Sequence, residues 1–379
     1  MSEQRHFKND KHRSGKANAH SELGASLTRI NIHNPPVQTC STGWHFDGLY
    51  YGPTSIAYLF LRLSSIYPDL EFKNQSLLDW AQAYLELGAN TRQSGVDPDH
   101  CGIANETLAQ LAIQAVVIHD SSLAQKLCSY ANRINTMSDE GSNEWLYGRA
   151  GYLYYLRLVK QEFGPEKNSS AHKIISDTID KTVERILVSP QPWQWHGKAY
   201  LGAVHGSVGI ICQIVLSSPS AAPKLETLLT ELLKTQFASG NFPSSFPPGS
   251  DRLVQFCHGG PGFIICLQSL RAHFPRLQSK IDSAISAARK DVWKRGLLTK
   301  EPCLCHGIPT NALALDDDAE FEHFLSCMSS DTLEDQNWLG DAGRSDKFAS
   351  LYTGEAGRAW TWAVADKRLN KACIGFNDL

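Results

Sequence analysis

The stretch CHGGPGFIICLQSL, residues 257–270, joins a glycine-rich turn to an apolar helical segment, and this combination recurs along the chain. Related turns begin at glycines that lie 46 to 58 residues apart, namely Gly52, Gly102, Gly148, Gly206, Gly259, Gly307 and Gly354. Four of the seven turns have the form GxxG, and the others end in Ser55, Asn105 and Thr310. Such regular spacing is typical of repeat proteins, whose units bury their apolar faces against one another.

Each turn is followed by a segment that is apolar on more than one side, such as GYLYYLRLV at residues 151–159, which suits a buried inner helix. Longer amphipathic segments lie between these. In residues 172–188 the apolar side chains fall on one helical stripe, at Ile175, Ile179, Val183 and Ile186. No segment alternates like a strand bounded by hairpin turns. The pattern predicts an all-α fold, a seven-repeat α/α toroid with inner and outer rings of seven helices.

Composition limits the function classes. The chain has 379 residues, 42% of them hydrophobic, and a net charge of -3, which gives no case for a nucleic-acid partner. No uncharged apolar run approaches membrane-spanning length, and the polar first twenty residues lack a signal-peptide core. We expect a flexible polar tail over residues 1–42, one domain over 43–379, a cytoplasmic location and no integral membrane association. Most of the ten cysteines then read as reduced core thiols.

If the repeats are equivalent, the residues before each first glycine share one rim of the toroid. In repeats four to six these residues place His205, the pair Cys257 and His258, and the pair Cys305 and His306 on adjacent loops facing one cavity. Two thiolates and one imidazole are favoured zinc ligands, and three protein ligands leave a fourth position open for catalysis. We therefore predict a catalytic zinc site made of Cys257, Cys305 and His306.

Each of these motifs also has a structural alternative. A single CHG triplet is more often a packed cysteine and histidine, and only its repetition at corresponding positions favours a metal. His205 has the alternative of a cavity-wall residue. His100 and Cys101 are interpreted as the corresponding pair of repeat two, with a structural role, and Cys303 as a spectator, with a redox partner as the alternative.

The motifs resemble the lanthionine synthetase C-like family, particularly its eukaryotic branch, from about residue 43 to the end. The matching stretches are WLYGRAGYLYYL, YLGAVHGSVGI, SGNFPSS, DRLVQFCHGGPG, CLCHG and SLYTGEAG. The resemblance implies an α/α toroid with one zinc ion on Cys257, Cys305 and His306. Bacterial members activate a peptide cysteine that adds to dehydroalanine or dehydrobutyrine. Eukaryotic members look like enzymes that add glutathione to such residues in proteins.

Further roles are implied by the resemblance, residue by residue. His205 matches a candidate acid that protonates the enolate, and Glu144 matches a position where bacterial members have a catalytic aspartate. Arg252 lies where a cation could stabilise enolate charge. Lys300 matches a basic residue that meets an anionic thiol such as glutathione, and His258 is a further substrate-binding candidate. The alternative for Lys300 and Arg252 is a solvated surface charge.

The leading hypothesis is zinc-dependent addition of a thiol, with glutathione as the favoured substrate, to a dehydrated residue in a peptide or protein, forming a thioether. A non-catalytic zinc-containing glutathione-binding or scaffold protein is one alternative, and glutathione conjugation to small electrophiles is another. Glycoside hydrolysis, which other α/α toroids perform, needs paired carboxylates where this chain has Cys and His. The sixth turn departs from the family by placing Thr310 where a glycine is usual, which we expect to narrow the cavity or alter substrate fit.

Overall fold

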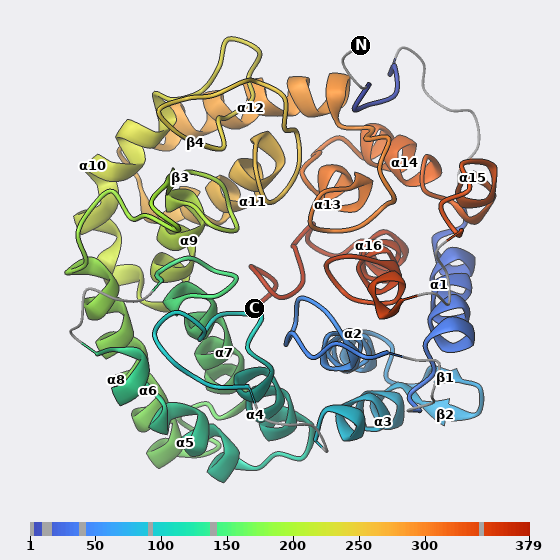
Figure 1. The fold of residues 1–379 in the computed structure, drawn as a ribbon, viewed down its shortest axis with the longest axis horizontal. Helices are drawn as coiled ribbons and strands as arrows, with labels where there is room; N and C mark the ends of the chain where they lie inside the picture. Colours follow the sequence, from blue (N-terminus) through green and yellow to red (C-terminus); the bar gives the residue numbers. More distant parts are fainter. Residues whose placement is uncertain (1–3, 10–16, 38–42, 90–93, 137–141, 341–344) are drawn as a thin grey trace.

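Two concentric rings of helices form the molecule (Figure 1). The computed structural model describes residues 4–9, 17–37, 43–89, 94–136, 142–340 and 345–379. The inner ring contains one helix from each predicted repeat: α2 (Pro53–Ile66), α4 (Glu106–Val117), α7 (Arg149–Glu162), α9 (Ser207–Ser217), α11 (Gly260–Leu270), α13 (Ile308–Leu313) and α16 (Glu355–Lys367). The predicted all-α, seven-repeat toroid is confirmed.

The outer ring consists of amphipathic helices that cover the inner ones. They are α3 (Leu77–Ala89), α5 (Ser121–Ser129) with α6 (Ala131–Ile134), α8 (Ser169–Leu187), α10 (Ala222–Leu233), α12 (Gln278–Arg295), α14 (Asp318–Ser326) with α15 (Ser330–Asp335), and α1 (Ala19–His33). Short 3-10 helices lie at Pro219–Ala221, Arg271–His273 and Asp346–Phe348. Two antiparallel strand pairs complete the described residues: β1 (Glu71–Phe72) with β2 (Gln75–Ser76), and β3 (Ala199–Tyr200) with β4 (Ser245–Phe246).

Residues 19–33 form a helix within the segment 1–42 that was predicted to be a flexible tail, and residues 1–3, 10–16 and 38–42 of that prediction lie outside the described residues. This helix, α1, packs against α16 and supplies the outer helix of the last repeat (Figure 1). The side chains of Leu23, Leu27 and Ile30, which lie on one face at helical spacing, are buried. An ion pair of 3.0 Å joins Arg29 to the buried carboxylate of Glu355 on α16. Ring closure therefore uses a helix from the opposite end of the chain, so the toroid does not begin at residue 43.

Each inner helix begins directly after a rim turn. In six repeats the residue before the helix is the predicted glycine, but in repeat two it is Asn105, whose side chain accepts a hydrogen bond of 3.0 Å from the amide of Leu108. The register of this repeat is thus three residues later than predicted. The counterpart of Cys257 and Cys305 in repeat two is Ile103, so the assignment of His100 and Cys101 to that position is wrong.

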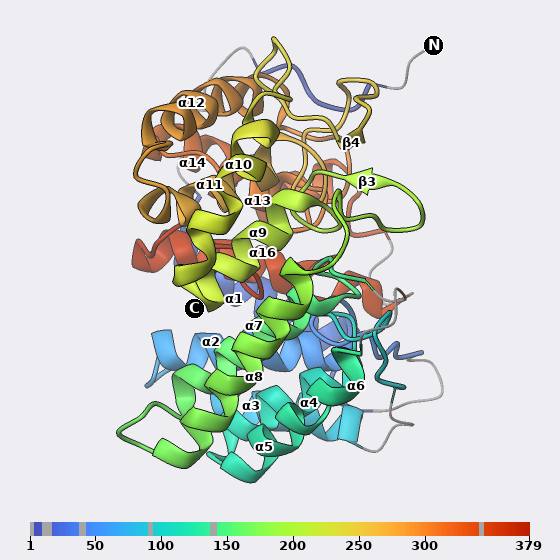
Figure 2. The ribbon, with the colours of Figure 1, turned by 90° about the vertical axis from the view of Figure 1, so that its left-hand side faces the viewer.

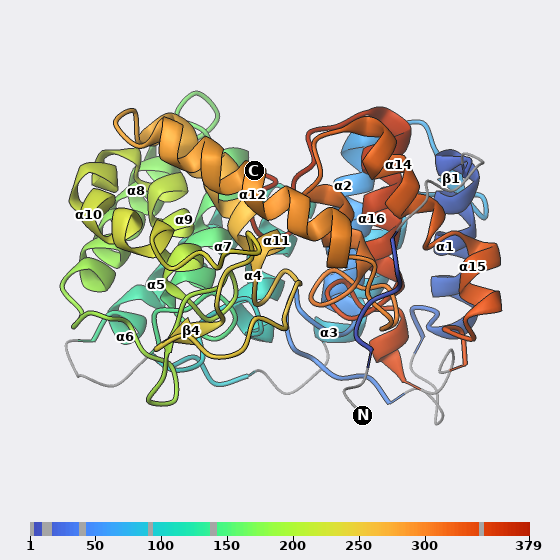
Figure 3. The same ribbon diagram turned by 90° about the horizontal axis from the view of Figure 1, so that it is seen from above.

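Backbone hydrogen bonds connect successive rim turns. The bonds join Cys257 N to Cys305 O (3.1 Å), Cys305 N to Tyr352 O (3.0 Å), Tyr352 N to Tyr50 O (3.3 Å), Leu49 N to Ile103 O (2.9 Å), Ile103 N to Trp145 O (3.1 Å) and Trp145 N to Val204 O (3.0 Å). The turns lie on the face of the toroid that carries β3 and β4, and the C-terminus lies toward the opposite face (Figures 2 and 3). Through these hydrogen bonds, residues about fifty positions apart in the sequence become neighbours on the rim.

The second glycine of each GxxG turn lets the helix approach its own turn closely. A Cβ there would come within 1.9 to 2.3 Å of a backbone carbonyl oxygen, that of Trp145 for Gly151, Ala203 for Gly209, Phe256 for Gly262 and Leu351 for Gly357. In the sixth repeat the corresponding contact is a hydrogen bond of 2.8 Å from the Thr310 hydroxyl to Leu304 O. Thr310 is fully buried in the core. Contrary to the expectation, its side chain therefore does not narrow the rim cavity.

Substituting Gly209 with alanine is expected to destabilise the protein by about 1–3 kcal/mol, because the new Cβ would overlap the carbonyl oxygen of Ala203. Chemical denaturation measures the change in free energy of unfolding. The matched control is Gly24→Ala on the exposed side of α1, where no atom lies within 4 Å, and there we expect about 1 kcal/mol of stabilisation from helix propensity. Equal stability of the two variants would contradict the close approach.

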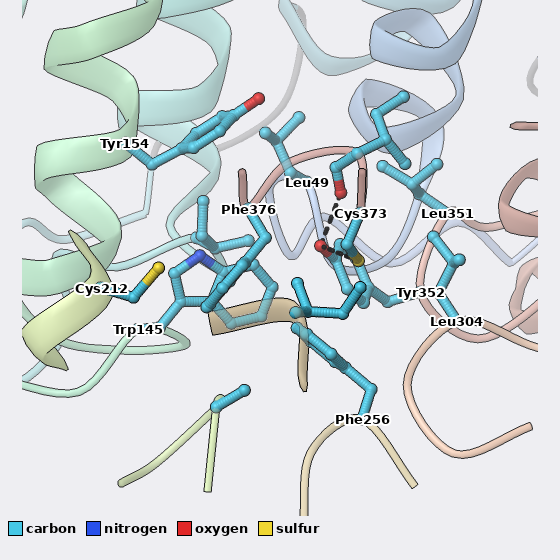
Figure 4. Close-up of a cluster of buried hydrophobic side chains, with 14 of the residues drawn as sticks. Leu49, Trp145, Tyr154, Cys212, Phe256, Leu304, Leu351, Tyr352, Cys373 and Phe376 are labelled. Atoms are coloured by element: carbon cyan, nitrogen blue, oxygen red, sulfur yellow. Dashed lines mark hydrogen bonds between the residues drawn. The ribbon is translucent and has the colours of Figure 1, made fainter. Parts of the chain in front are cut away.

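The C-terminal residues fill the centre of the inner ring. Phe376 is fully buried and lies against the rings of Trp145 (5.5 Å between centroids) and Phe256 (5.2 Å), as Figure 4 shows. Its carbonyl accepts hydrogen bonds from Arg157 (3.1 Å) and Gln213 (3.0 Å) of two inner helices. The tail thus acts as an internal core beneath the rim turns. No helix in the described part of the chain is long and apolar enough to cross a membrane.

Candidate active site

Two thiols meet on the rim, from the fifth and sixth turns. A backbone hydrogen bond of 3.1 Å joins Cys257 N to Cys305 O, and both side chains are buried and close enough to shift each other's pKa. Gln255 Nε2 donates to Cys257 Sγ at 3.0 Å, and the Tyr50 hydroxyl donates to Cys305 Sγ at 3.3 Å. The interaction with the Cys305 thiol and the hydrogen bond from Gln255 lower the pKa of the Cys257 thiol despite its burial, whereas the interaction with Cys257 and burial raise the pKa of Cys305. Neither Gln255 nor Tyr50 was predicted from the sequence as a site residue.

The third predicted ligand, His306, directly follows Cys305 in the sequence, and its side chain is half-buried. Burial, together with the cations of Lys300 and Lys347, lowers the pKa of His306 to about 4, so the imidazole is neutral at physiological pH. Neutral imidazole is the form that binds zinc. Over the described ranges, however, no three His, Cys, Asp or Glu side chains are grouped closely enough to hold a metal ion. The structure therefore brings together two of the three predicted ligands.

On the fourth turn, His205 forms a pair with Glu144 of the third. The distance from His205 Nδ1 to Glu144 Oε2 is 2.8 Å, and the carboxylate is almost completely buried. Glu144 also accepts backbone hydrogen bonds from Leu146 (2.8 Å) and Tyr147. A carboxylate fixed in this way orients the imidazole and leaves Nε2 available for proton transfer. His205 and Glu144, each predicted separately as a catalytic candidate, are thus hydrogen-bonded to each other.

The His205–Glu144 pair lies beside the turn that carries Cys257. The ring of His258, which follows Cys257, lies 6.0 Å from the ring of His205, centroid to centroid. Burial lowers the pKa of His258 to about 4, and electrostatic repulsion from His205 and Lys198 contributes to this shift. The buried Nδ1 of His258 has no hydrogen-bond partner among the described residues. The rim therefore combines neighbouring thiols, an oriented imidazole and an unsatisfied nitrogen.

Comparison with known proteins shows which family the chain belongs to. The sequence model of the family described as "Lanthionine synthetase C-like protein" matches residues 43–372. The chain belongs to this family. It is 30% identical over 378 residues to "Glutathione S-transferase LANCL1" of Danio rerio, covering 89% of this chain and 84% of that protein. It is 28% identical over 242 residues to "LanC-like protein GCL1" of Arabidopsis thaliana, covering 58% and 54% of the two chains.

Among solved structures, "Nisin cyclase" superimposes with a TM-score of 0.53 at 12% sequence identity, over 94% of this chain and 95% of that one. At 12% identity, this similarity shows that the two chains share a fold. The names of these relatives include a glutathione transferase and a cyclase, so the family contains enzymes.

An aromatic cluster around His205 in this LanC-like chain could not be predicted from the repeat. Trp195 stacks on the imidazole, with 3.9 Å between ring centroids and 5° between planes. Tyr147 lies parallel to the imidazole at 6.5 Å, and Tyr200 lies at 5.8 Å from it. Trp195 and Tyr200 come from the segment before the fourth turn, which has no counterpart in the repeat pattern. The aromatic run WQWHGKAY at residues 193–200 was the only signal for them in the sequence.

The remaining candidates occupy different places around the LanC-like site. Lys300 is exposed, but its charge helps to lower the pKa of Cys257 and of His306. A cavity of about 290 Å³ adjoins the sixth and seventh turns, and Lys347 lines it. Arg252 is exposed and its guanidinium forms no ion pair with any described residue, so the geometry favours a surface charge. Burial raises the pKa of Cys303 to about 12, in keeping with a spectator.

Proposed function

We propose that this LanC-like protein adds a thiol, with glutathione as substrate, to dehydroalanine or dehydrobutyrine residues of peptides or proteins. The observation that carries the proposal is the meeting of the Cys257–Cys305 thiol pair with the His205–Glu144 pair on neighbouring turns of one rim. The names of the glutathione transferase and cyclase relatives support the same reaction class. Nine free cysteines in the described residues fit the cytoplasm as the site of action.

Zinc is part of the proposal, and the donor set fits it chemically. Two buried thiols on neighbouring turns and a neutral imidazole on the residue after Cys305 are favoured zinc ligands, and the lowered pKa of Cys257 eases its ionisation. Cys257, Cys305 and His306 would hold the ion, which requires the imidazole of His306 to join the two sulfurs. When bound, zinc would supply the thiolate form of the substrate at neutral pH.

The protein's own side chains account for the remaining steps. Lys300 and Lys347 offer positive charge to the carboxylates of an anionic thiol. The substrate sulfur forms a bond to the β-carbon of the acceptor, the carbon–carbon double bond is consumed, and an enolate results. His205, oriented by Glu144 through Nδ1, takes up on Nε2 the proton that the thiol loses and then delivers it to the α-carbon. The net reaction adds S–H across the double bond, and no oxidant or reductant is needed.

Mass spectrometry of a dehydroalanine-containing peptide, incubated with glutathione and zinc-quantified protein, tests the proposal. We expect a glutathione adduct whose formation depends on the protein. A full zinc complement without any adduct would contradict the enzymatic proposal and favour the binding or scaffold alternative. Adducts formed with an aryl electrophile but not with the peptide would instead favour conjugation to small molecules.

A further inference from the structure

Trp195 covers one face of the His205 imidazole. The two ring planes differ by 5° and their centroids lie 3.9 Å apart, which is direct face-to-face contact. On the edge of the same imidazole, Nδ1 is held by Glu144 at 2.8 Å. Among the described residues Nε2 has no hydrogen-bond partner. The imidazole is therefore restrained at one edge and on one face, and only the second nitrogen remains available.

The contact matters because a single hydrogen bond leaves a histidine ring poorly restrained. Rotation about the terminal side-chain torsion is broad for histidine, so the ring could tilt about its bond to Glu144 and move Nε2. An aromatic plane against the imidazole blocks this tilt. Proton delivery is sensitive to such movements, since misplacing a reacting group by about 1 Å can reduce the rate by roughly 100-fold.

The chain holds Trp195 on a rigid support. Reciprocal backbone hydrogen bonds of 3.0 and 3.1 Å join Trp195 to Lys198, across a turn in which His196 and Gly197 have φ of 47° and 70°. Two successive residues with positive φ are typical of the tight type I′ hairpin turn. The next two residues form β3, which pairs with β4. This hairpin places the indole by backbone geometry, so the stacking does not depend on side-chain contacts alone.

We infer that Trp195 is a positioning residue for proton transfer: its indole holds the imidazole of His205 so that Nε2 faces the reacting carbon. The inference rests on the proposed function, because it assumes that His205 supplies the proton. Trp195 itself touches neither thiol nor acceptor in this role. Its removal should therefore lower kcat and leave the KM for glutathione unchanged.

Kinetics of the Trp195→Ala and Trp195→Phe variants test the inference. We expect kcat for adduct formation to fall about 10- to 100-fold in Trp195→Ala, and to recover to within about threefold of wild type in Trp195→Phe, which retains an aromatic plane. Adding Trp195→Ala to His205→Ala should cause no further loss, since residues that act as a unit are not additive. The matched control is Phe246→Ala, an exposed aromatic on β4, which should leave kcat unchanged.

A second measurement needs no turnover. In protein labelled with ¹³C at histidine Cε1, the Cε1–H resonance of His205 should be shifted by the ring current of the indole and should move in Trp195→Ala. An unmoved resonance would overturn the stacking, and a moved resonance with unchanged kcat would overturn the positioning role. A higher KM for the acceptor with normal kcat would overturn it as well, because Trp195 would then be an acceptor-binding surface. Full activity of His205→Ala would instead refute the proposed acid, and the resonance would still report the stack.

Discussion

Replacing Cys305 with alanine is expected to remove bound zinc and adduct formation together. The sulfur of Cys305 lies beside the Cys257 thiol and accepts the Tyr50 hydroxyl, so its loss leaves one thiol where the proposal needs two. Loss of a residue that only supports a metal ligand costs about 10- to 100-fold in metal affinity, and loss of a ligand should cost more than that. Metal analysis by plasma mass spectrometry and the adduct assay check both effects on the same sample.

The control for this prediction is Cys128→Ala. Cys128 is equally buried, but it lies on the outer helix α5 and burial raises its pKa to about 11, so it should affect neither zinc nor turnover. Full retention of zinc by Cys305→Ala and by Cys257→Ala would refute the proposed ligand set. Loss of zinc with full adduct formation would refute the role of the metal. Thiol addition would then have to be explained by the His205–Glu144 pair alone.

Substitution of His205 with alanine is expected to reduce the rate of adduct formation by about 10²- to 10⁴-fold, the usual contribution of a general acid, without loss of zinc. His205 is bound to Glu144 and lies beside His258, but it is none of the three proposed ligands. The variant should also bind glutathione normally. Calorimetric titration with glutathione and the adduct assay separate binding from turnover.

Glu144→Gln provides the companion variant. The amide cannot replace the negative charge that stabilises the protonated imidazole, so we expect a smaller loss of rate than in His205→Ala and no further loss in the double variant. Because Glu144 also accepts backbone hydrogen bonds at the third turn, the melting temperature must be measured alongside. Normal turnover by a folded His205→Ala protein would exclude this histidine as the proton donor.

Much of the site could be predicted because its residues are tied to the repeat. A turn before each inner helix is a local feature, and equivalent turns of a closed ring must lie side by side. The period of the glycines is therefore enough to place Cys257, Cys305 and His205 on neighbouring turns. The same argument failed in repeat two, where Asn105 caps the helix in place of glycine and moves the register by three residues.

The residues that escaped prediction do so for different reasons. Trp195 reaches His205 from a hairpin between two repeat units and has no equivalent in the other repeats. Gln255 and Tyr50 lie within the repeat turns, but the residue type differs from turn to turn at their positions, so the repeat could not show that they contact the thiols. The exposure of Arg252 also could not be predicted, because spacing from Cys257 specifies a loop position but not the direction of a long side chain.

The amino-acid sequence was sufficient to predict the number of repeats, the inner helices, amphipathic outer helices such as that of residues 172–188, and the set of turns that share the rim. These features follow from apolar periodicity and turn chemistry, which act over a few residues. The folded molecule was needed to see how the ring closes with α1, how Phe376 fills its centre, and how Glu144 and Trp195 hold His205. Those contacts join segments far apart in the chain, and they depend on packing that no local pattern specifies.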